Sequence, residues 1–484
     1  MKVLSGLQPQ PLFNYFEEIC QVPRPSKKEE RIRQFLIDFA HNNGLIPKTD
    51  EAGNVLIYKP ATPGMENAPT VILQTHMDMV CEKNSDKVFD FDNDPIEPVI
   101  ADGWVNASGT TLGADCGIGI AAQLAVLTSK EIKHGPLECL ITVDEETGLT
   151  GAFALKPGFL KGNILLNLDS EDEGEIFIGC AGGIDTVATF TYLKNEVPKD
   201  SVAFKIMVSG LLGGHSGDDI HKNRGNANKI AARFLQKASI NINLKLADFN
   251  GGNLRNAIAR EAALLVVLSG NKSEILARDF EQFKSEVIFE FERAEPGLKL
   301  ALERTELPVF TIDNETQEKL INTLMACPHG VLEMSTRMEG MVETSTNLAS
   351  VKFTGDDKIV VTTSQRSEIE SRKHYAAQMV EAVFNLAGAE VAHSDGYPGW
   401  TPNPDSEVLK ITVKSYEQLF GVKPIVRSIH AGLECGLFLE KYPGLDMVSF
   451  GPTIRGAHSP DERLDIGTTQ KFWVHLVDVL ESLK

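Results

Sequence analysis

Cysteine is scarce in this chain of 484 residues, and long apolar runs are missing. The seven cysteines are scattered without a C-x-x-C pair, which argues against a disulfide scaffold, a zinc ribbon or a thioredoxin-type site. No run reaches the roughly 18 apolar residues of a membrane-spanning helix. The opening MKVLSGLQPQPLF lacks the apolar stretch of a secretory signal. We therefore expect a soluble cytoplasmic protein in a reducing compartment, with no membrane partner.

Basic residues are too few for a protein that binds nucleic acid nonspecifically. Lys and Arg number 47 against 67 Asp and Glu, which gives a net charge of -20, whereas such binding rests on neutralising phosphates. The composition, 42% hydrophobic and 24% charged, is that of an ordinary globular protein. At about 150 residues per domain the length predicts roughly three domains, and two large ones fit equally well.

The first part of the chain alternates short apolar runs with helical patterns. A helix is predicted over 26–44, with Ser26 and Glu29 as a capping box and Gly44 as its stop, and another from near Gly117 through Leu127. The strand-like runs are Val55–Tyr58, Val71–Thr75, Leu140–Val143 and Ile164–Leu168. This alternation predicts an α/β fold whose mixed, largely parallel sheet is covered by helices.

The pattern changes after Gly182 and Gly183. Between them and residue 396 the strands are longer and more alternating, and charged helices separate them, as in an α+β domain. The run Leu445–Phe450 resembles the buried strands of the first part again, and a last helix is expected over 469–483. We therefore predict a catalytic domain split between residues 1–184 and 397–484, with an inserted lid domain over 185–396.

Acidic residues and histidines follow the strand-like runs of the first domain. In open α/β sheets ligands bind beyond the carboxyl ends of the strands, so these groups are expected to converge. The group consists of His76, Asp78, Asp115, Asp144, Glu145, Glu146, Asp169 and His458. Singly, each has an ordinary alternative as a solvated loop residue, a helix cap, a turn residue or a surface histidine.

Taken together, these side chains make a coherent metal site. Imidazole and carboxylate ligands suit zinc and similar divalent ions. One carboxylate between two metals would hold them about 3.5–4 Å apart, the usual spacing of a two-metal hydrolytic site. His76 and Asp78 lie two apart on an extended segment and so on one side, which suits a ligand with an orienting carboxylate behind it. In the Asp-Glu-Glu run, one carboxylate could bind metal and its neighbour could act as a base.

Six segments carry a resemblance to a known family. They are VILQTHMDMV, TLGADCGIGIAA, ITVDEETGLTGA, LLNLDSEDEGE, SGLLGGHSG and RGAHSPDE. In this order, over essentially the whole chain, they resemble the zinc-dependent aminoacylase, carboxypeptidase and carnosinase-like peptidases. The resemblance implies that His76 and Asp169 bind one zinc, that Glu146 and His458 bind the other, and that Asp115 bridges them. It also implies that Asp78 orients His76 and that Glu145 is the general base.

The resemblance also assigns roles in the inserted domain. His215, flanked by glycines, would stabilise the carbonyl oxygen of the substrate, and Asn256 and Arg366 would hold its C-terminal carboxylate, for which a planar guanidinium is suited. From the residues alone, His215 is as easily part of a turn, and the other two are surface polar residues. Near Gly432, Glu434 could meet an α-ammonium group or could begin a buried helix.

The function implied is hydrolysis of dipeptides, of the Xaa-His type and including carnosine-like substrates. Two Zn²⁺ ions per subunit are expected, which Co²⁺ or Mn²⁺ could replace, together with a dipeptide substrate and a homodimer. Two alternatives stay open, an N-acyl amino-acid hydrolase or aminotripeptidase of the same family, and a noncatalytic protein that binds metal or peptide. Glu145 distinguishes the last of these, since a binding protein needs ligands but no base.

Overall fold

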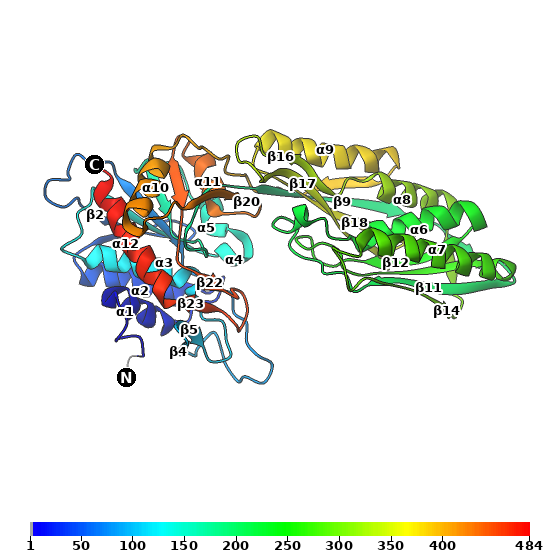
Figure 1. Ribbon diagram of the computed structural model, residues 1–484, viewed down its shortest axis with the longest axis horizontal. Coiled ribbons are helices and arrows are strands. Elements are labelled where there is room, and N and C mark those ends of the chain that lie inside the picture. Colours follow the sequence, from blue (N-terminus) through cyan, green and yellow to red (C-terminus); the bar gives the residue numbers. More distant parts are fainter. Residues whose placement is uncertain (1–2) are drawn as a thin grey trace. The chain divides into compact units, whose positions relative to one another are not determined.

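The computed structural model describes residues 3–484, which divide into two compact units (Figure 1). Unit 1 comprises the chain through Gly179 together with Pro402–Ser428 and Leu433–Lys484, and unit 2 comprises Cys180–Thr401 and Ile429–Gly432. The main segment of unit 2 extends five residues beyond the expected insertion of 185–396 at each end. The reason is that Cys180 and Trp400 exchange two backbone hydrogen bonds, of 3.0 and 2.9 Å, and so pair the two ends of unit 2.

Unit 1 is built on an eight-stranded mixed sheet with the order β1-β2-β6-β3-β7-β21-β8-β20. Its central strands β6, β3, β7 and β21 are parallel, whereas β1 and β2 on one side and β8 on the other pair antiparallel. The strands are β1 (Ile46–Thr49), β2 (Val55–Lys59), β3 (Val71–His76), β6 (Leu137–Thr142), β7 (Ile164–Asn167), β8 (Glu175–Cys180), β20 (Ile425–Ile429) and β21 (Asp446–Ser449). The predicted α/β class, with a largely parallel sheet centre, is confirmed.

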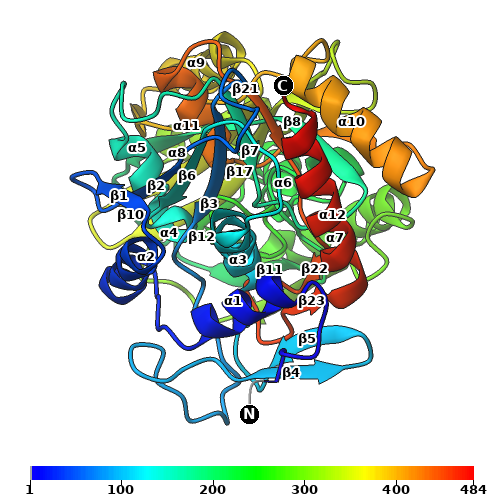
Figure 2. The ribbon, with the colours of Figure 1, turned by 90° about the vertical axis from the view of Figure 1, so that its left-hand side faces the viewer.

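Helices cover both faces of this sheet. Figure 2 shows α3 and α12 on one side of the strands and α5 and α11 on the other. Every residue of β3 is buried, which explains why its sequence is a continuous run without polar alternation. The helices are α1 (Gln10–Cys20), α2 (Glu30–Asn42), α3 (Ala114–Thr128), α4 (Glu145–Gly148), α5 (Thr150–Ala154), α10 (Glu407–Phe420), α11 (Glu434–Lys441) and α12 (Ile466–Ser482).

A second, antiparallel sheet in unit 1 has the order β22-β23-β5-β4. Its strands are β4 (Pro98–Ala101), β5 (Trp104–Ala107), β22 (Ile454–Arg455) and β23 (Arg463–Asp465). The strands β22 and β23 form a hairpin in which Arg455 pairs with Arg463, so residues 456–462 are its turn. This turn carries His458.

The predicted capping box of the helix over 26–44 is wrong. Helix α2 begins at Glu30 and has no side-chain cap. The Ser26 hydroxyl instead donates to Asp78 Oδ2 at 2.8 Å, and Glu29 Oε1 accepts from the backbone N–H groups of Lys27 and Asp144 at 2.7 and 3.1 Å. Both polar side chains therefore hold loops from other parts of the chain, a use that the local pattern does not distinguish from a cap.

Unit 2 has the predicted α+β arrangement. Its main sheet has nine strands, in the order β14-β11-β13-β12-β17-β18-β9-β19 with β16 beside β17, and its recorded pairings are all antiparallel. Figure 1 shows α6 to α9 along one face of this sheet. Phe234 of α6 lies at the centre of the core, 5.3 Å from the rings of Phe280 and Phe283 on α7.

The elements of unit 2 have the following bounds. The strands are β9 (Gly182–Thr191), β10 (Lys194–Glu196), β11 (Ser201–Ser209), β12 (Lys245–Gly251), β13 (Ala262–Ser269), β14 (Lys299–Thr305), β15 (Phe310–Ile312), β16 (Gly330–Met334), β17 (Val342–Thr354), β18 (Lys358–Ser367) and β19 (Glu390–His393). The helices are α6 (Ala227–Ile242), α7 (Ser273–Phe291), α8 (Asn314–Ala326) and α9 (Glu370–Leu386), with short 3-10 turns at Ile220–Lys222 and Gly270–Lys272. Within residues 3–484, no helix combines the length and the apolar character that a bilayer crossing requires.

Candidate active site

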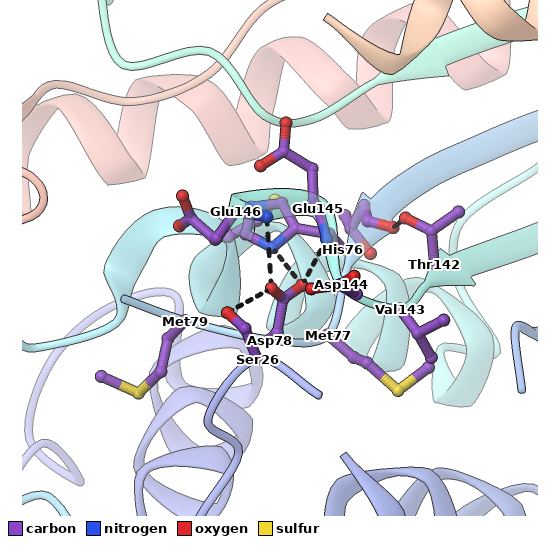
Figure 3. Close-up of polar contacts among 12 residues, drawn as sticks. Ser26, His76, Met77, Asp78, Met79, Thr142, Val143, Asp144, Glu145 and Glu146 are labelled. Carbon is purple, nitrogen blue, oxygen red and sulfur yellow. Dashed lines mark hydrogen bonds and ion pairs between the residues drawn. The ribbon is translucent and has the colours of Figure 1, made fainter. Parts of the chain in front are cut away.

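The carboxyl end of β3 supplies the first two side chains of the site. His76 is its last residue and is only 1% exposed, and its Nδ1 lies 3.3 Å from Asp78 Oδ1 (Figure 3). The side chains of Met77 and Met79 point away from this pair. His76 and Asp78 thus lie on one side of the extended segment, as their spacing predicted.

Asp78 connects His76 to the loop that carries the two adjacent glutamates. Its Oδ1 accepts the backbone N–H of Glu145 at 3.0 Å, and its Oδ2 accepts that of Glu146 at 3.2 Å (Figure 3). Burial alone would raise the pKa of Asp78. The hydrogen bond and the positive charge of His76, together with hydrogen bonds from the Ser26 hydroxyl and the Glu145 N–H, lower this pKa to about 2. Asp78 is therefore a carboxylate that fixes an imidazole ring and a loop at once.

Asp115 lies between two histidines and offers one oxygen to each. Its Oδ1 is 3.0 Å from His76 Nε2, and its Oδ2 is 3.3 Å from His458 Nε2. Asp169 Oδ1 completes the first group at 3.2 Å from His76 Nε2, and Glu146 Oε2 completes the second at 3.1 Å from His458 Nε2. The structure thus brings together all five residues predicted to bind metal, in two sets that share one carboxylate.

These two sets fit a pair of divalent cations. Glu146 Oε1 is buried and makes no hydrogen bond, and the buried Asp169 Oδ1 has only the contact with His76 Nε2 at 3.2 Å and the hydrogen bond of the Cys116 thiol near it. Hydrogen bonds to Asp115 and Glu146 raise the pKa of His458 to about 11, so the surrounding carboxylates favour a positive charge at this place. The ligand atoms of Asp115, Glu146 and His458 lie within 4.8 Å of one another. Nitrogen and oxygen donors of this kind suit zinc.

The Asp-Glu-Glu run turns its three side chains in different directions. Asp144 has a left-handed backbone, with φ of 50°, and its carboxylate accepts the hydroxyls of Thr147 and Thr150 instead of facing the ligands. Burial raises the pKa of the Glu145 carboxyl well above its usual value, although the charge of His76 lowers it, and the charges of Asp169 and Glu146 raise it further. A carboxyl with a raised pKa is suited to transferring protons near neutral pH.

The residues that lead into α3, together with its first residues up to Asp115, where the backbone departs from helical geometry, form a loop with buried charges on two sides. Neither charge was predicted from the sequence. Arg24 donates from Nη1 to the carbonyl oxygens of Met77 and Asp78 at 3.2 and 2.7 Å, and from Nη2 to that of Gly113. A Cβ at Gly113, where φ is 68°, would lie 2.5 Å from Arg24 Nη2. On the other side, the carboxylate of Glu462 faces the N–H groups of the same loop. Nothing in the sequence marks Arg24, whereas Glu462 falls inside the RGAHSPDE segment.

Glu434 begins helix α11 and is buried, so the expectation of a buried helix start is confirmed. Its Oε2 accepts from Gln74 Nε2 at 2.6 Å and from Thr142 Oγ1 at 2.7 Å, and burial raises the pKa of the carboxyl to about 8. Gln74 also accepts from Asn167 Nδ2, which extends this polar network across β3 and β7. Contact with a substrate ammonium group stays a prediction.

His215 is held in a state that can donate a hydrogen bond. Its Nδ1 accepts the backbone N–H of Asp218 at 3.2 Å, which assigns the proton of the neutral ring to Nε2. Burial and the charge of Arg366 lower the pKa of the imidazole, so the neutral form is favoured. The backbone N–H of His215 donates to Asp219 Oδ2 at 2.8 Å.

Arg366 is a buried cation without a carboxylate partner. Its side chain is 6% exposed, its Nη1 donates to Tyr397 Oη at 2.8 Å, and its Nε donates to Ser216 Oγ at 3.3 Å. Among residues 3–484 it takes part in no recorded ion pair. Asn256 is exposed, and its backbone carbonyl accepts the Ser216 N–H at 2.8 Å, so the three predicted substrate residues surround Ser216. Tyr397 was not predicted, because only the fold brings it to Arg366.

Comparison with known proteins gives a consistent result over the whole chain. Residues 72–482 match peptidase family M20/M25/M40. The cytosol non-specific dipeptidase of Escherichia coli (strain K12) is 44% identical over 483 residues, which is 100% of this chain and 99% of that protein. The crystal structure of aminoacylhistidine dipeptidase from Vibrio alginolyticus matches with a TM-score of 0.92 and 48% identity, covering 99% of this chain and 98% of that one. A tripeptidase from Staphylococcus aureus shares the fold, with a TM-score of 0.57 and 19% identity over 98% of both chains.

We predict that Asp115→Ala loses both metals, whereas His76→Ala and His458→Ala each lose chiefly one. The reason is that Asp115 is the only one of the five predicted ligands that offers an oxygen to both histidines. A shared carboxylate also offsets the repulsion between two dications. Metal analysis of the purified variants after dialysis measures this. Two tightly held ions in Asp115→Ala would remove Asp115 from the bridging position.

Proposed function

This chain belongs to peptidase family M20/M25/M40, and we propose that it is a dinuclear zinc dipeptidase that hydrolyses Xaa-His dipeptides, including carnosine-like ones. The observation that carries the proposal is the position of Asp115, whose two oxygens face two separate sets of ligands. The dipeptide substrate is supported by two full-length relatives whose names describe dipeptidases, one of them an aminoacylhistidine dipeptidase.

In this proposal His76 and Asp169 hold one zinc, Glu146 and His458 hold the other, and Asp115 binds both. When bound, the two ions would supply a water with a pKa of about 7 and would polarise the substrate carbonyl. Asp78 keeps the His76 ring oriented through the 3.3 Å contact at Nδ1. Co²⁺ or Mn²⁺ could replace zinc, since both accept the same nitrogen and oxygen donors.

Glu145 is the general base in this mechanism. It takes a proton from the attacking water and later donates it to the leaving amine. Its raised pKa suits both steps, and the hydrogen bond from its backbone N–H to Asp78 places it beside His76. Because Asp144 turns toward Thr147 and Thr150, it takes no part in the proton transfer.

We assign substrate binding to His215, Asn256 and Arg366 of unit 2. Neutral His215, with its proton on Nε2, can donate to the oxygen that becomes negative during attack. Arg366 suits the C-terminal carboxylate of the substrate. A buried guanidinium without an anionic partner destabilises the folded chain, and a bound carboxylate would remove that destabilisation. The hydrogen bond from the Ser216 N–H to the backbone carbonyl of Asn256 supports including Asn256 in this group.

We also propose that the enzyme acts in the cytoplasm as a homodimer. The E. coli relative is named as a cytosol enzyme, and the seven cysteines of this chain are scattered without a C-x-x-C pair. Sizing combined with activity measured over a dilution series tests the dimer. An aminotripeptidase of the same family is the second candidate function, because the Staphylococcus aureus tripeptidase shows that this fold is compatible with it.

A substrate panel with and without a chelator tests the proposed activity. We expect zinc-dependent release of free amino acids from dipeptides, with the highest kcat/KM for those that end in histidine. N-acyl amino acids and tripeptides should be poor substrates, and removal of metal should abolish turnover of all of them. Preferred cleavage of a tripeptide would select the second candidate, and tight binding without turnover would mean a noncatalytic protein.

Substituting each of the two adjacent glutamates in turn should distinguish their roles. Glu145→Gln should retain both metals yet lose at least about 10²–10⁴-fold in turnover, because the amide cannot accept a proton at neutral pH. Glu146→Gln should lose metal occupancy together with activity, since one of its oxygens lies beside His458. Metal analysis and kcat are measured on both variants. If occupancy falls only in Glu145→Gln, the two roles must be exchanged.

His215→Ala should keep both metals and lose turnover. Removing one donor to a developing oxyanion typically lowers kcat by about 10²–10³-fold. The matched control is His221→Ala, which removes an exposed histidine six residues further along the same loop. A kcat for His215→Ala close to that of the unmodified enzyme and of the control would exclude a catalytic part for this histidine.

A further inference from the structure

The carboxylate of Glu462 is surrounded by backbone donors of the loop that carries Asp115. Its Oε2 accepts the N–H groups of Leu112 and Gly113 at 2.7 and 2.9 Å, and its Oε1 accepts those of Ala114 and Asp115 at 2.7 and 3.3 Å. Glu462 is 2% exposed. Four consecutive N–H groups therefore converge on one buried side chain, and the last of them belongs to the proposed bridging residue.

The same loop has a buried cation on its carbonyl side. Arg24, also 2% exposed, donates to the carbonyl oxygen of Gly113 and to those of Met77 and Asp78. A peptide group is a dipole. It is stabilised at both ends when its N–H faces an anion and its carbonyl oxygen faces a cation. The backbone before Asp115 is thus held between Glu462 and Arg24.

Glu462 also belongs to the turn that carries His458. Within this turn the Ser459 N–H donates to the Gly456 carbonyl at 3.2 Å, and the Glu462 N–H donates to the Ser459 carbonyl at 3.0 Å. The hydroxyl of Ser459 donates to the same Gly456 carbonyl at 2.7 Å. His458 and Glu462 therefore belong to one internally bonded turn, and the side chain of Glu462 ties this turn to the Asp115 loop.

We propose that Glu462 is a positioning residue that fixes the distance between the bridging carboxylate of Asp115 and the imidazole of His458, and thereby sets the affinity for both metals. This inference rests on the proposed metal roles of Asp115 and His458. Glu462 touches neither substrate nor metal in this account. Its effect passes through the backbone, as does that of other residues that orient metal ligands.

Glu462→Gln tests the proposal with little change in volume. The amide keeps one acceptor oxygen but presents an N–H donor where the carboxylate had its second oxygen, so two of the four backbone donors lose their partner. Titration with Co²⁺, followed by its visible absorption, measures occupancy and ligand geometry without an activity assay. We expect both Co²⁺ sites to weaken by about 10–100-fold, the usual effect of losing a partner that orients a metal ligand. His458→Ala, by contrast, should weaken chiefly one site.

Two matched controls separate positioning from a general loss of stability. Glu138 is likewise a buried carboxylate of unit 1 and accepts the backbone N–H groups of Lys161 and Gly162 at 2.9 and 3.0 Å. Glu138→Gln should lower the thermal midpoint but leave Co²⁺ affinity unchanged. Asp461→Asn removes a charge from the same turn as Glu462, at an exposed position, and should change neither quantity.

The outcomes are distinct. Wild-type affinity and an unchanged Co²⁺ spectrum in Glu462→Gln would overturn the proposal, as would an equal loss of affinity in Glu138→Gln. If Glu462→Gln does not fold, Glu462→Asp is titrated instead. Its carboxylate is shorter and cannot reach all four donors, so both sites should weaken, and unchanged affinity would overturn the proposal equally. Failure of the unmodified protein to bind two Co²⁺ ions would contradict the proposed function, not the part played by Glu462.

Discussion

Repulsion between buried carboxylates is the physical constraint on which the organisation of unit 1 depends. Asp115, Glu146 and Asp169 lie around two imidazole rings, and Glu145 stands beside them with its pKa raised by burial and by their charges. Like charges at this spacing destabilise a folded chain unless positive charge is present among them. The two histidines supply part of it, and two divalent cations would supply the rest. The same constraint makes the Glu145 carboxyl hold a proton more readily than an ordinary glutamate does.

Backbone N–H groups also stabilise buried carboxylates, because each carries a partial positive charge and requires no charged side chain. Asp78 receives two of them from the loop of Glu145 and Glu146, and Glu462 receives four from the loop of Asp115. Unit 2 shows the same arrangement near His215. There Glu295 accepts the N–H groups of Leu212 and Gly225, at 2.7 and 2.8 Å, on either side of the histidine loop. In each case a buried carboxylate holds the loop that presents a side chain with a proposed role in binding or catalysis.

Much of this could be predicted from the sequence, because the central strands are parallel. Their carboxyl ends meet at one edge of the sheet, so residues that follow β3, β6 and β7 had to lie near one another. The resemblance to a peptidase family then assigned individual roles, which stay proposals. Arg24 and Glu462 could not be found in this way. Arg24 and Glu462 bind residues that lie 89 and 350 positions away in the sequence, respectively. The hydrogen bonds involve backbone atoms of those partners, so no particular side chain at the partner position indicates them. Ser26 and Glu29 were misread because a capping box and two long-range hydrogen bonds use the same residue types.

The glycines around Asp115 limit which substitutions this part of the sequence can accept. A Cβ at Gly117 would lie 2.7 Å from Arg24 Nη2, and one at Gly119 would lie 2.8 Å from the Leu168 carbonyl oxygen. With Gly113 these positions leave no space for a side chain on either side of Asp115. A side chain at any of these three glycines would therefore have to displace Arg24 or the atoms around Cys116 and Leu168. By contrast, residues 254–256 of unit 2 are exposed, so substitutions there meet no such steric limit.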